Sequence, residues 1–328
     1  MRARRPVAQA RTEHLNAVKA FYSDHFVLPL PPEHSFPMAK YRLLRERLAA
    51  DAILSPENIA EAPAVDWDTL HLVHTPAYAD AVRTGTLSRE AQRRIGFPWS
   101  PEMVERSRRS VGATIAAARY ALSHPSGTAT NLAGGTHHAF ADRGEGFCVF
   151  NDVAVATRLL RRDGLVHRVV VIDCDVHQGN GTAAIFRDDR SVFTFSMHGR
   201  NNYPFRKETS DLDLEWPDGT RDGEYLAALE EHLPGLLARH QPDLVFYLAG
   251  ADPYEHDRWG RLKLTIEGLR RRDVIVLEAC RTGGVPVAVT MAGGYARDVE
   301  AIVTIHANTI RVAAACAVSR TASRIAVR

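Results

Sequence analysis

The strongest constraint on the fold is a set of short, almost uninterrupted apolar segments. They lie at residues 169–172, 192–195, 244–248 and 285–289. Runs of this kind predict strands that are buried on both faces, as in a parallel sheet. Residues 222–240 and 266–281 carry Leu, Ile, Val and Ala at helical spacing, which predicts crossover helices between the strands. The alternation indicates an α/β fold: a single open three-layer α/β/α domain with a mostly parallel central sheet.

Length and composition are compatible with one large globular domain. The chain has 328 residues, of which 45% are hydrophobic, and no internal repeat or low-complexity linker divides it. We therefore expect a single domain over residues 1–328, with a core at about 20–310 and short terminal tails. Because 41 basic residues are balanced by 39 acidic ones, the net charge of +2 does not indicate a nucleic-acid partner.

Other features of the sequence bear on the compartment. No apolar run is long enough to span a membrane, and the arginines near the N-terminus are not followed by the apolar core of a signal peptide. The 4 cysteines lie far apart without a C-x-x-C pair, which argues against a disulfide framework and a zinc ribbon. We expect a protein of the reducing cytoplasm without a membrane span, and its oligomeric state stays open.

Polar and glycine-rich residues follow the predicted strands. These segments are 173–181, 249–252 and 291–295, and an earlier segment, 131–139, places paired histidines behind two glycines. In an open parallel sheet, ligands bind outside the carboxyl ends of the strands. We therefore expect these segments to converge on one functional site.

Asp173, Asp175 and His177 alternate at i, i+2 and i+4, so their side chains would project to one side of an extended backbone. Carboxylate and imidazole are ligands that suit zinc or another first-row divalent ion, and a catalytic site needs only three of them. Asp252 can complete a set with Asp175 and His177. The simpler interpretation, that each residue caps the following helix, weakens when all are considered together.

His137 and His138 are adjacent, and alone they could be solvated turn residues. Both can border the metal site only if separate polar partners orient the two rings. Asp173 and Asn180 are the candidates for this orienting role.

The ordered segments resemble the zinc-dependent histone deacetylases and their bacterial relatives, including acetoin-utilisation proteins and acetylpolyamine amidohydrolases. The matching segments are 34–41, 134–139, 146–152, 173–181, 250–252 and 293–295. The resemblance covers about residues 20–310 and implies the arginase/deacetylase fold. Residues 35–38, 95–98 and 257–260 look most like the class IV branch.

The resemblance implies roles for the catalytic residues. The metal ligands would be Asp175, His177 and Asp252, and Asp173 would hydrogen-bond His137, the electrostatic partner. His138 would be the general base and later the general acid, and Tyr295 would donate its phenol to the substrate carbonyl. Asn180, the partner of His138, stands where many relatives have an aspartate. It would stabilise an imidazolium less than a carboxylate does.

The resemblance also implies a narrow tunnel for an acylated lysine. Its walls would include Gly146, Phe147, Tyr203 and Trp259, although packing into the core is an alternative role for each aromatic ring. A structural potassium or sodium ion would be held by Asp173, Ser196 and the backbone around Asp175, His177 and Met197. The catalytic ion would be zinc, with ferrous iron as an alternative.

The expected function is therefore a zinc-dependent deacylase that hydrolyses acyl-lysine, acetyl or longer, in a peptide or protein. One alternative is an amidohydrolase for acetylpolyamines or small metabolites, and Glu255 and Asp257 could give such an enzyme an acidic rim. A binuclear manganese ureohydrolase of the arginase type and a non-catalytic acyl-lysine binding module are further alternatives. Ligand counting disfavours the first of these, and the intact base and phenol disfavour the second.

Overall fold

The protein is built around one open sheet of eight parallel strands. The computed structural model describes residues 18–326, with side chains up to residue 317. The strands are β1 (Lys19–Tyr22), β2 (Ile59–Glu61), β3 (Thr128–Asn131), β4 (Val169–Asp173), β5 (Val192–Gly199), β6 (Leu212–Trp216), β7 (Leu244–Leu248) and β8 (Val287–Thr290). Their order in the sheet is β2-β1-β3-β8-β7-β4-β5-β6, and each neighbouring pair is parallel. The predicted α/β class is confirmed, and the sheet is entirely rather than mostly parallel.

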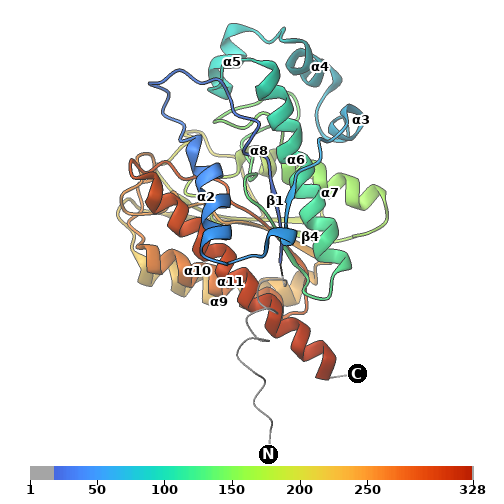
Figure 1. Ribbon diagram of the computed structural model, residues 1–328, viewed down its shortest axis with the longest axis vertical. Helices are drawn as coiled ribbons and strands as arrows, with labels where there is room; N and C mark the ends of the chain where they lie inside the picture. The colour runs from blue at the N-terminus through green and yellow to red at the C-terminus, as the bar shows by residue number, and fades with distance from the viewer. Residues whose placement is uncertain (1–17, 327–328) are drawn as a thin grey trace, which may run out of the picture.

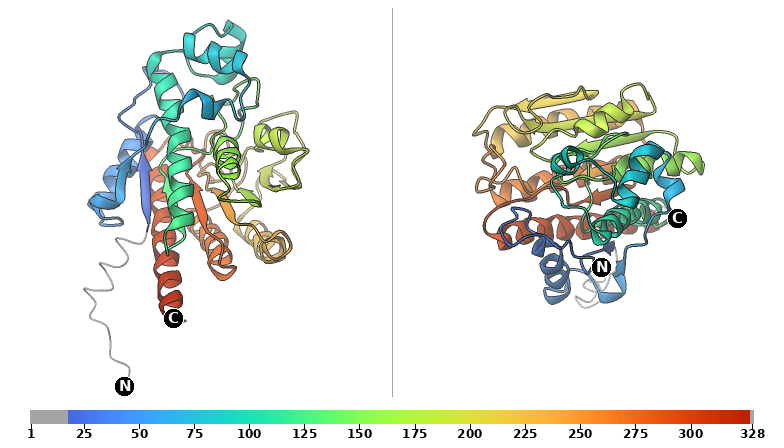
Figure 2. Two further views of the ribbon diagram at one scale, coloured as in Figure 1. Left: turned by 90° about the vertical axis from the view of Figure 1, so that its right-hand side faces the viewer. Right: turned by 90° about the horizontal axis from the view of Figure 1, so that it is seen from above.

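Helices cover both faces of the sheet (Figures 1 and 2). One face carries α2 (Ala39–Ala50), α9 (Asp222–His240), α10 (Ile266–Thr282) and α11 (Val299–Ala326), and the other carries α6 (Pro101–Ser123), α7 (Asp152–Arg162) and α8 (Asn180–Phe186). Strand β4 shows why both faces need cover. Val170 and Ile172 belong to the hydrophobic cluster under α2, α9, α10 and α11, whereas Val169 and Val171 belong to the cluster under α6, α7 and α8. A strand that is apolar on both sides is stable only between two helical layers.

The remaining helices are short and lie in the N-terminal half. They are the 3₁₀ turn η1 (Pro56–Asn58), α3 (Trp67–Leu70), α4 (Pro76–Thr84) and α5 (Arg89–Ile95). Figure 1 shows α4 and α5 gathered at one end of the molecule beside the start of α6. Since α6 runs from there toward β3, this is the end at which the parallel strands finish. No helix in the described range is long and apolar enough to cross a membrane.

The predicted elements need small corrections at their ends. Strand β8 begins at Val287, not at residue 285, because Pro286 has no N–H to contribute to the sheet. Strand β5 continues to Gly199 because β6, which the sequence did not predict, pairs with its second half. Helix α11, whose bounds were not predicted from the sequence, runs from Val299 to Ala326.

A buried arginine connects the helical layer to two strand ends. Arg272, on α10, is fully buried, and its Nη1 donates to the carbonyl oxygens of Gly250 (2.6 Å) and Cys174 (3.3 Å). These carbonyls lie just beyond β7 and β4. The guanidinium charge is balanced by Asp273, whose Oδ1 accepts from Nε at 3.0 Å and Nη2 at 2.8 Å. Tyr247 and Thr309 also donate to Asp273.

We predict that Asp273→Ala lowers the free energy of unfolding by about 3–5 kcal/mol, because it leaves the Arg272 charge buried without a counter-ion. Urea unfolding followed by circular dichroism measures this. The control is Glu46→Ala, which breaks a pair with Arg42 whose side chains are 53% and 49% exposed. It should cost less than about 1 kcal/mol. Equal losses in the two variants would contradict the prediction.

Candidate active site

Three metal-ligand side chains meet at the carboxyl edge of the sheet. Asp175 and His177 follow β4 and Asp252 follows β7, so the adjacent parallel strands deliver all three to one place. One ligand atom from each lies within 4.8 Å of the others, and all three residues are buried. The predicted ligand set is therefore brought together by the fold.

The surroundings of this group fit a divalent cation. The backbone N–H of Gly293 donates to Asp175 Oδ2 (2.8 Å) and that of Val176 to Asp252 Oδ1 (2.9 Å), but the buried Asp252 Oδ2 accepts no hydrogen bond. A Cβ atom at Gly293 would collide with both carboxylates, so glycine leaves the space beside them open. Oxygen and nitrogen donors of this kind suit zinc or ferrous iron.

The pKa values of this group show that it stabilises positive charge. Burial and the nearby Asp175 raise the pKa of Asp252 to about 7. Burial opposes a charge on His177, but its hydrogen bond to Asp175 and the carboxylate of Asp252 raise the pKa of this imidazole to about 10. His177 Nδ1 lies 3.0 Å from Asp175 Oδ1 and 3.2 Å from Asp252 Oδ2, so the three donor atoms face one another.

The loop that carries the paired histidines is shaped by glycines and by one carboxylate. Gly134 and Gly135 have positive φ angles of 75° and 70°, which favour glycine. Asp152, at the start of α7, accepts from the N–H groups of Gly135 (2.9 Å) and Thr136 (2.8 Å). It also accepts from the Thr114 hydroxyl on α6 (2.6 Å). The sequence pattern did not assign this role to Asp152.

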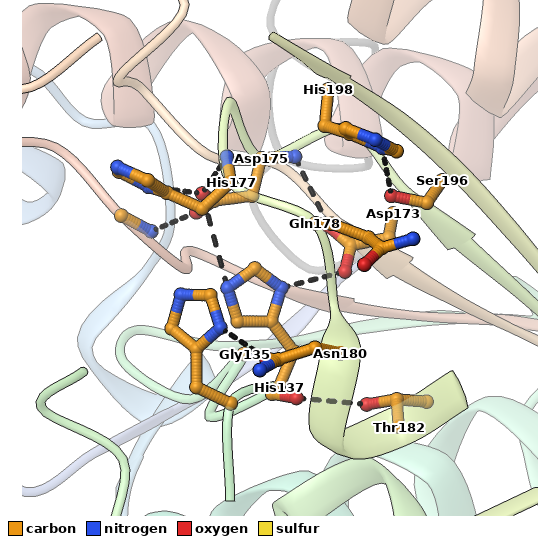
Figure 3. Close-up of polar contacts among 12 residues, drawn as sticks. Gly135, His137, Asp173, Asp175, His177, Gln178, Asn180, Thr182, Ser196 and His198 are labelled. Atoms are coloured by element: carbon orange, nitrogen blue, oxygen red, sulfur yellow. Dashed lines mark hydrogen bonds and ion pairs between the residues drawn. The ribbon is translucent and has the colours of Figure 1, made fainter. Parts of the chain in front are cut away.

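Each of the two histidines has its own polar partner, and Figure 3 shows His137 beside Asp173. His137 Nδ1 lies 2.6 Å from Asp173 Oδ2, and His137 Nε2 lies 3.9 Å from Asp175 Oδ1. His138 Nδ1 lies 2.7 Å from Asn180 Oδ1, so its N–H donates to the amide oxygen. Nε2 of His138 is then left as the proton acceptor.

These environments shift the pKa values of the two imidazoles in opposite directions. Burial opposes a charge on His137, but Asp173 and Asp175 raise its pKa to about 9. Burial and the positive His137 and His177 hold the pKa of His138 well below its ordinary value. A charged imidazole therefore lies beside a neutral one, and only the neutral one can accept a proton.

Tyr295 follows β8 and the glycines 293 and 294. Its backbone N–H donates to Asp257 Oδ2 (2.7 Å), and Lys40 Nζ donates to the carbonyl of Gly294 (3.1 Å) while lying 5.2 Å from the Tyr295 ring centre. Burial and the carboxylates of Asp175 and Asp252 raise the pKa of the Tyr295 phenol well above its ordinary value. The phenol therefore keeps its proton and can act as a hydrogen-bond donor.

A cavity of about 400 Å³ leads from the surface to His138, His177 and Tyr295. Its other lining residues include the four predicted wall residues, Gly146, Phe147, Tyr203 and Trp259. The alternative of core packing holds in part for Phe147, whose ring also packs 5.2 Å from that of Phe36. It does not hold for Trp259, which is 49% exposed at the rim.

Tyr203 is held in place against the histidines. Its ring meets that of His138 edge-on, with the centres 4.9 Å apart, and its hydroxyl donates to Glu145 Oε2 (2.9 Å). The remaining lining residues are Arg94, Asn201, Asn202, Phe205 and Arg261, which the sequence did not single out. Arg94 lies at the end of α5, Asn201, Asn202 and Phe205 lie between β5 and β6, and Arg261 lies before α10, so no regular spacing connects the three places.

The predicted monovalent-cation residues are also neighbours. Asp173 and Ser196 are paired across β4 and β5, and Met197 follows on β5. The Ser196 hydroxyl lies 3.0 Å from His198 Nδ1, and Asp173 Oδ1 accepts from the N–H of Asp175 (3.1 Å).

The chain is similar to several known proteins. It is 49% identical over 292 residues to an uncharacterized protein of Picosynechococcus, a match that covers 89% of this chain and 97% of the relative. It is 30% identical to histone deacetylase 2 of Arabidopsis thaliana, with 87% of this chain and 76% of the relative covered. The crystal structure of the HD domain of HDA15 superposes with a TM-score of 0.77 at 21% identity, covering 94% of this chain and 93% of that domain.

The family model of the histone deacetylase domain matches residues 34–310. This range contains each of the metal-ligand, histidine and tyrosine residues described above. The chain therefore belongs to the histone deacetylase domain family.

Proposed function

We propose that the protein is a zinc-dependent deacylase that hydrolyses the N-acyl amide of acyl-lysine or a related acylated amine. The observation that carries this proposal is the convergence of Asp175, His177 and Asp252 at the inner end of an aromatic-lined cavity, with His138 and Tyr295 beside them. Ferrous iron is the alternative ion, and a potassium or sodium ion at Asp173 and Ser196 is part of the same proposal.

The catalytic roles follow from the protonation states. A divalent ion at these ligands would polarise the acyl carbonyl and acidify a water molecule. His138 Nε2 accepts the proton of the attacking water, because Nδ1 is engaged with Asn180, and then donates it to the leaving amine. Tyr295 donates its phenol proton in a hydrogen bond to the carbonyl oxygen as charge develops there. His137 keeps its positive charge beside His138 through the contact with Asp173.

The geometry favours this proposal over the alternatives. A binuclear ureohydrolase needs more carboxylates facing the ions, but among the described residues the ligand group consists of Asp175, His177 and Asp252. A binding module needs neither a neutral imidazole nor a phenol at the end of the cavity. The aromatic walls suit the methylene groups of a lysine side chain.

Metal content tests the ligand set directly. We predict one zinc or iron ion per chain by elemental analysis, and loss of this ion in Asp252→Ala because a ligand is removed. The matched control is Asp142→Ala, which removes a carboxylate with 64% side-chain exposure outside the ligand group and should keep the ion. Two ions per chain would favour the binuclear alternative, and a metal-free active enzyme would refute the proposal.

We predict that Tyr295→Phe lowers kcat for an acetyl-lysine peptide by about a hundredfold or more, because the oxyanion loses a donor. Steady-state deacetylation with metal-replete enzyme measures this. Tyr120→Phe is the control, since Tyr120 stacks on His124 at the far end of α6 and should leave kcat unchanged. Undiminished turnover by the Tyr295 variant would show that the phenol is not part of the chemistry.

A further prediction concerns the dependence of kcat/KM on pH. Asn180→Asp places a negative charge against His138 and stabilises the imidazolium, so the pKa of His138 rises. Because the neutral ring is the active form, the acidic limb of kcat/KM should move to higher pH by about one unit or more. The measurement is kcat/KM of the wild type and of the variant in buffers between pH 5 and 9. An acidic limb at the same pH in both proteins would mean that His138 is not the titrating base.

A further inference from the structure

The mouth of the cavity is lined by arginines and by no carboxylate of the described residues. These arginines are Arg94, at the end of α5, and Arg261. Each arginine makes one ion pair: Arg94 Nη1 lies 3.4 Å from Glu90 Oε1, and Arg261 Nη1 lies 3.2 Å from Asp218 Oδ2. A guanidinium carries five N–H donors, so a single contact leaves donors that can reach a substrate.

Two nearby carboxylates, those of Asp257 and Glu145, already have hydrogen-bond or ion-pair partners within the protein. Asp257 Oδ1 accepts from the N–H groups of Trp259 (2.8 Å) and Gly260 (2.9 Å), and its Oδ2 accepts from that of Tyr295. Glu145 is paired with Arg143 at 2.7 Å and with the Tyr203 hydroxyl. Glu255 does not line the cavity. The acidic rim considered from the sequence is therefore absent from the described mouth of the cavity.

The loops that form the mouth add further positive charge. Arg200, Arg206 and Arg258 are exposed, and each is adjacent in sequence to a lining residue. A cleft with apolar walls and charges of one sign concentrates the field and attracts ligands of the opposite sign. Arg200 also lies 3.8 Å from Glu215, but the charged side chains that line the cavity itself, Arg94 and Arg261, are both positive and favour an anionic group there.

We propose that the mouth selects acylated amines whose amine portion bears a carboxylate, and that Arg94 and Arg261 are the residues that recognise it. This inference rests on the proposed deacylase function. When the acyl amide reaches His138 and Tyr295, the methylene chain of a lysine spans the aromatic walls and its α-carbon lies at the mouth. The carboxylate can then be the α-carboxylate of free Nε-acyl-lysine or the side chain of an acidic residue beside acyl-lysine in a peptide. Acylated polyamines carry ammonium groups there and are repelled.

The test compares matched substrates with metal-replete enzyme. One series consists of acetyl-lysine peptides that differ only in having Glu, Gln or Lys beside the acetyl-lysine. A second series compares free Nε-acetyl-lysine with its carboxamide, and an acetylated polyamine is the cationic reference. We expect kcat/KM to be about three- to tenfold higher for the carboxylate-bearing member of at least one series, with the acetylated polyamine poorest. The series that shows the preference identifies the source of the carboxylate.

The variants assign that preference to the two arginines. In the double variant Arg94→Gln and Arg261→Gln, the ratio of kcat/KM for the carboxylate-bearing substrate to kcat/KM for the neutral one should fall to about one. High salt should lower this ratio for the wild type as well. Arg119→Gln is the matched control, because Arg119 is also ion-paired and has similar exposure (45% against 46% for Arg94) but lies near the far end of α6. It should leave the ratio unchanged.

The outcomes separate this inference from the proposed function. No metal-dependent turnover of any substrate would refute the deacylase itself. Turnover with equal rates for Glu and Gln peptides and for both lysine compounds would refute the charge selection alone. A preference that survives in the double variant would refute the role of the two arginines, and a preference for Lys peptides or the acetylated polyamine would reverse the inference.

Discussion

The site depends on two carboxylates, Asp175 and Asp252, that are buried side by side with a histidine between them. Burial of like charges is costly unless positive charge or hydrogen-bond donors compensate for it. Backbone N–H groups of Val176 and Gly293 compensate for part of the charge, and His177 for another part. Glycine at 293 keeps the space beside the two carboxylates open. The surrounding loops are thus arranged around a position where a cation is stabilised.

Burial and the nearby charged side chains together set the protonation of the neighbouring groups. His137 is close enough to Asp173 and Asp175 to carry a charge, whereas His138 has only the amide of Asn180 and remains neutral. Burial and the carboxylates of Asp175 and Asp252 raise the pKa of the Tyr295 phenol, so it keeps its proton. Burial and the nearby charges therefore give two imidazoles and one phenol different protonation states, as the proposed general base and hydrogen-bond donor require.

The central strands and the polar segments after them could be predicted from the sequence, because runs such as 244–248 are apolar on both faces and the carboxyl ends of parallel strands meet. Strands β2 and β3 could not: β3 reads Thr-Ala-Thr-Asn and β2 has three residues, so only long-range pairing makes them strands. The metal ligands were predictable for the same reason as β4 and β7. Arg94 and Arg261 were not, since ordinary surface arginines acquire a common location only through the tertiary fold.

The link from Arg272 to the carbonyls of Cys174 and Gly250 has a consequence for conformational entropy. Ordering one residue of backbone costs about 1–2 kcal/mol. In this protein the strand ends that bear Asp175 and Asp252 are ordered by a buried side chain that belongs to the folded core. That entropy loss therefore accompanies folding, and an arriving ion meets ligands that need little rearrangement.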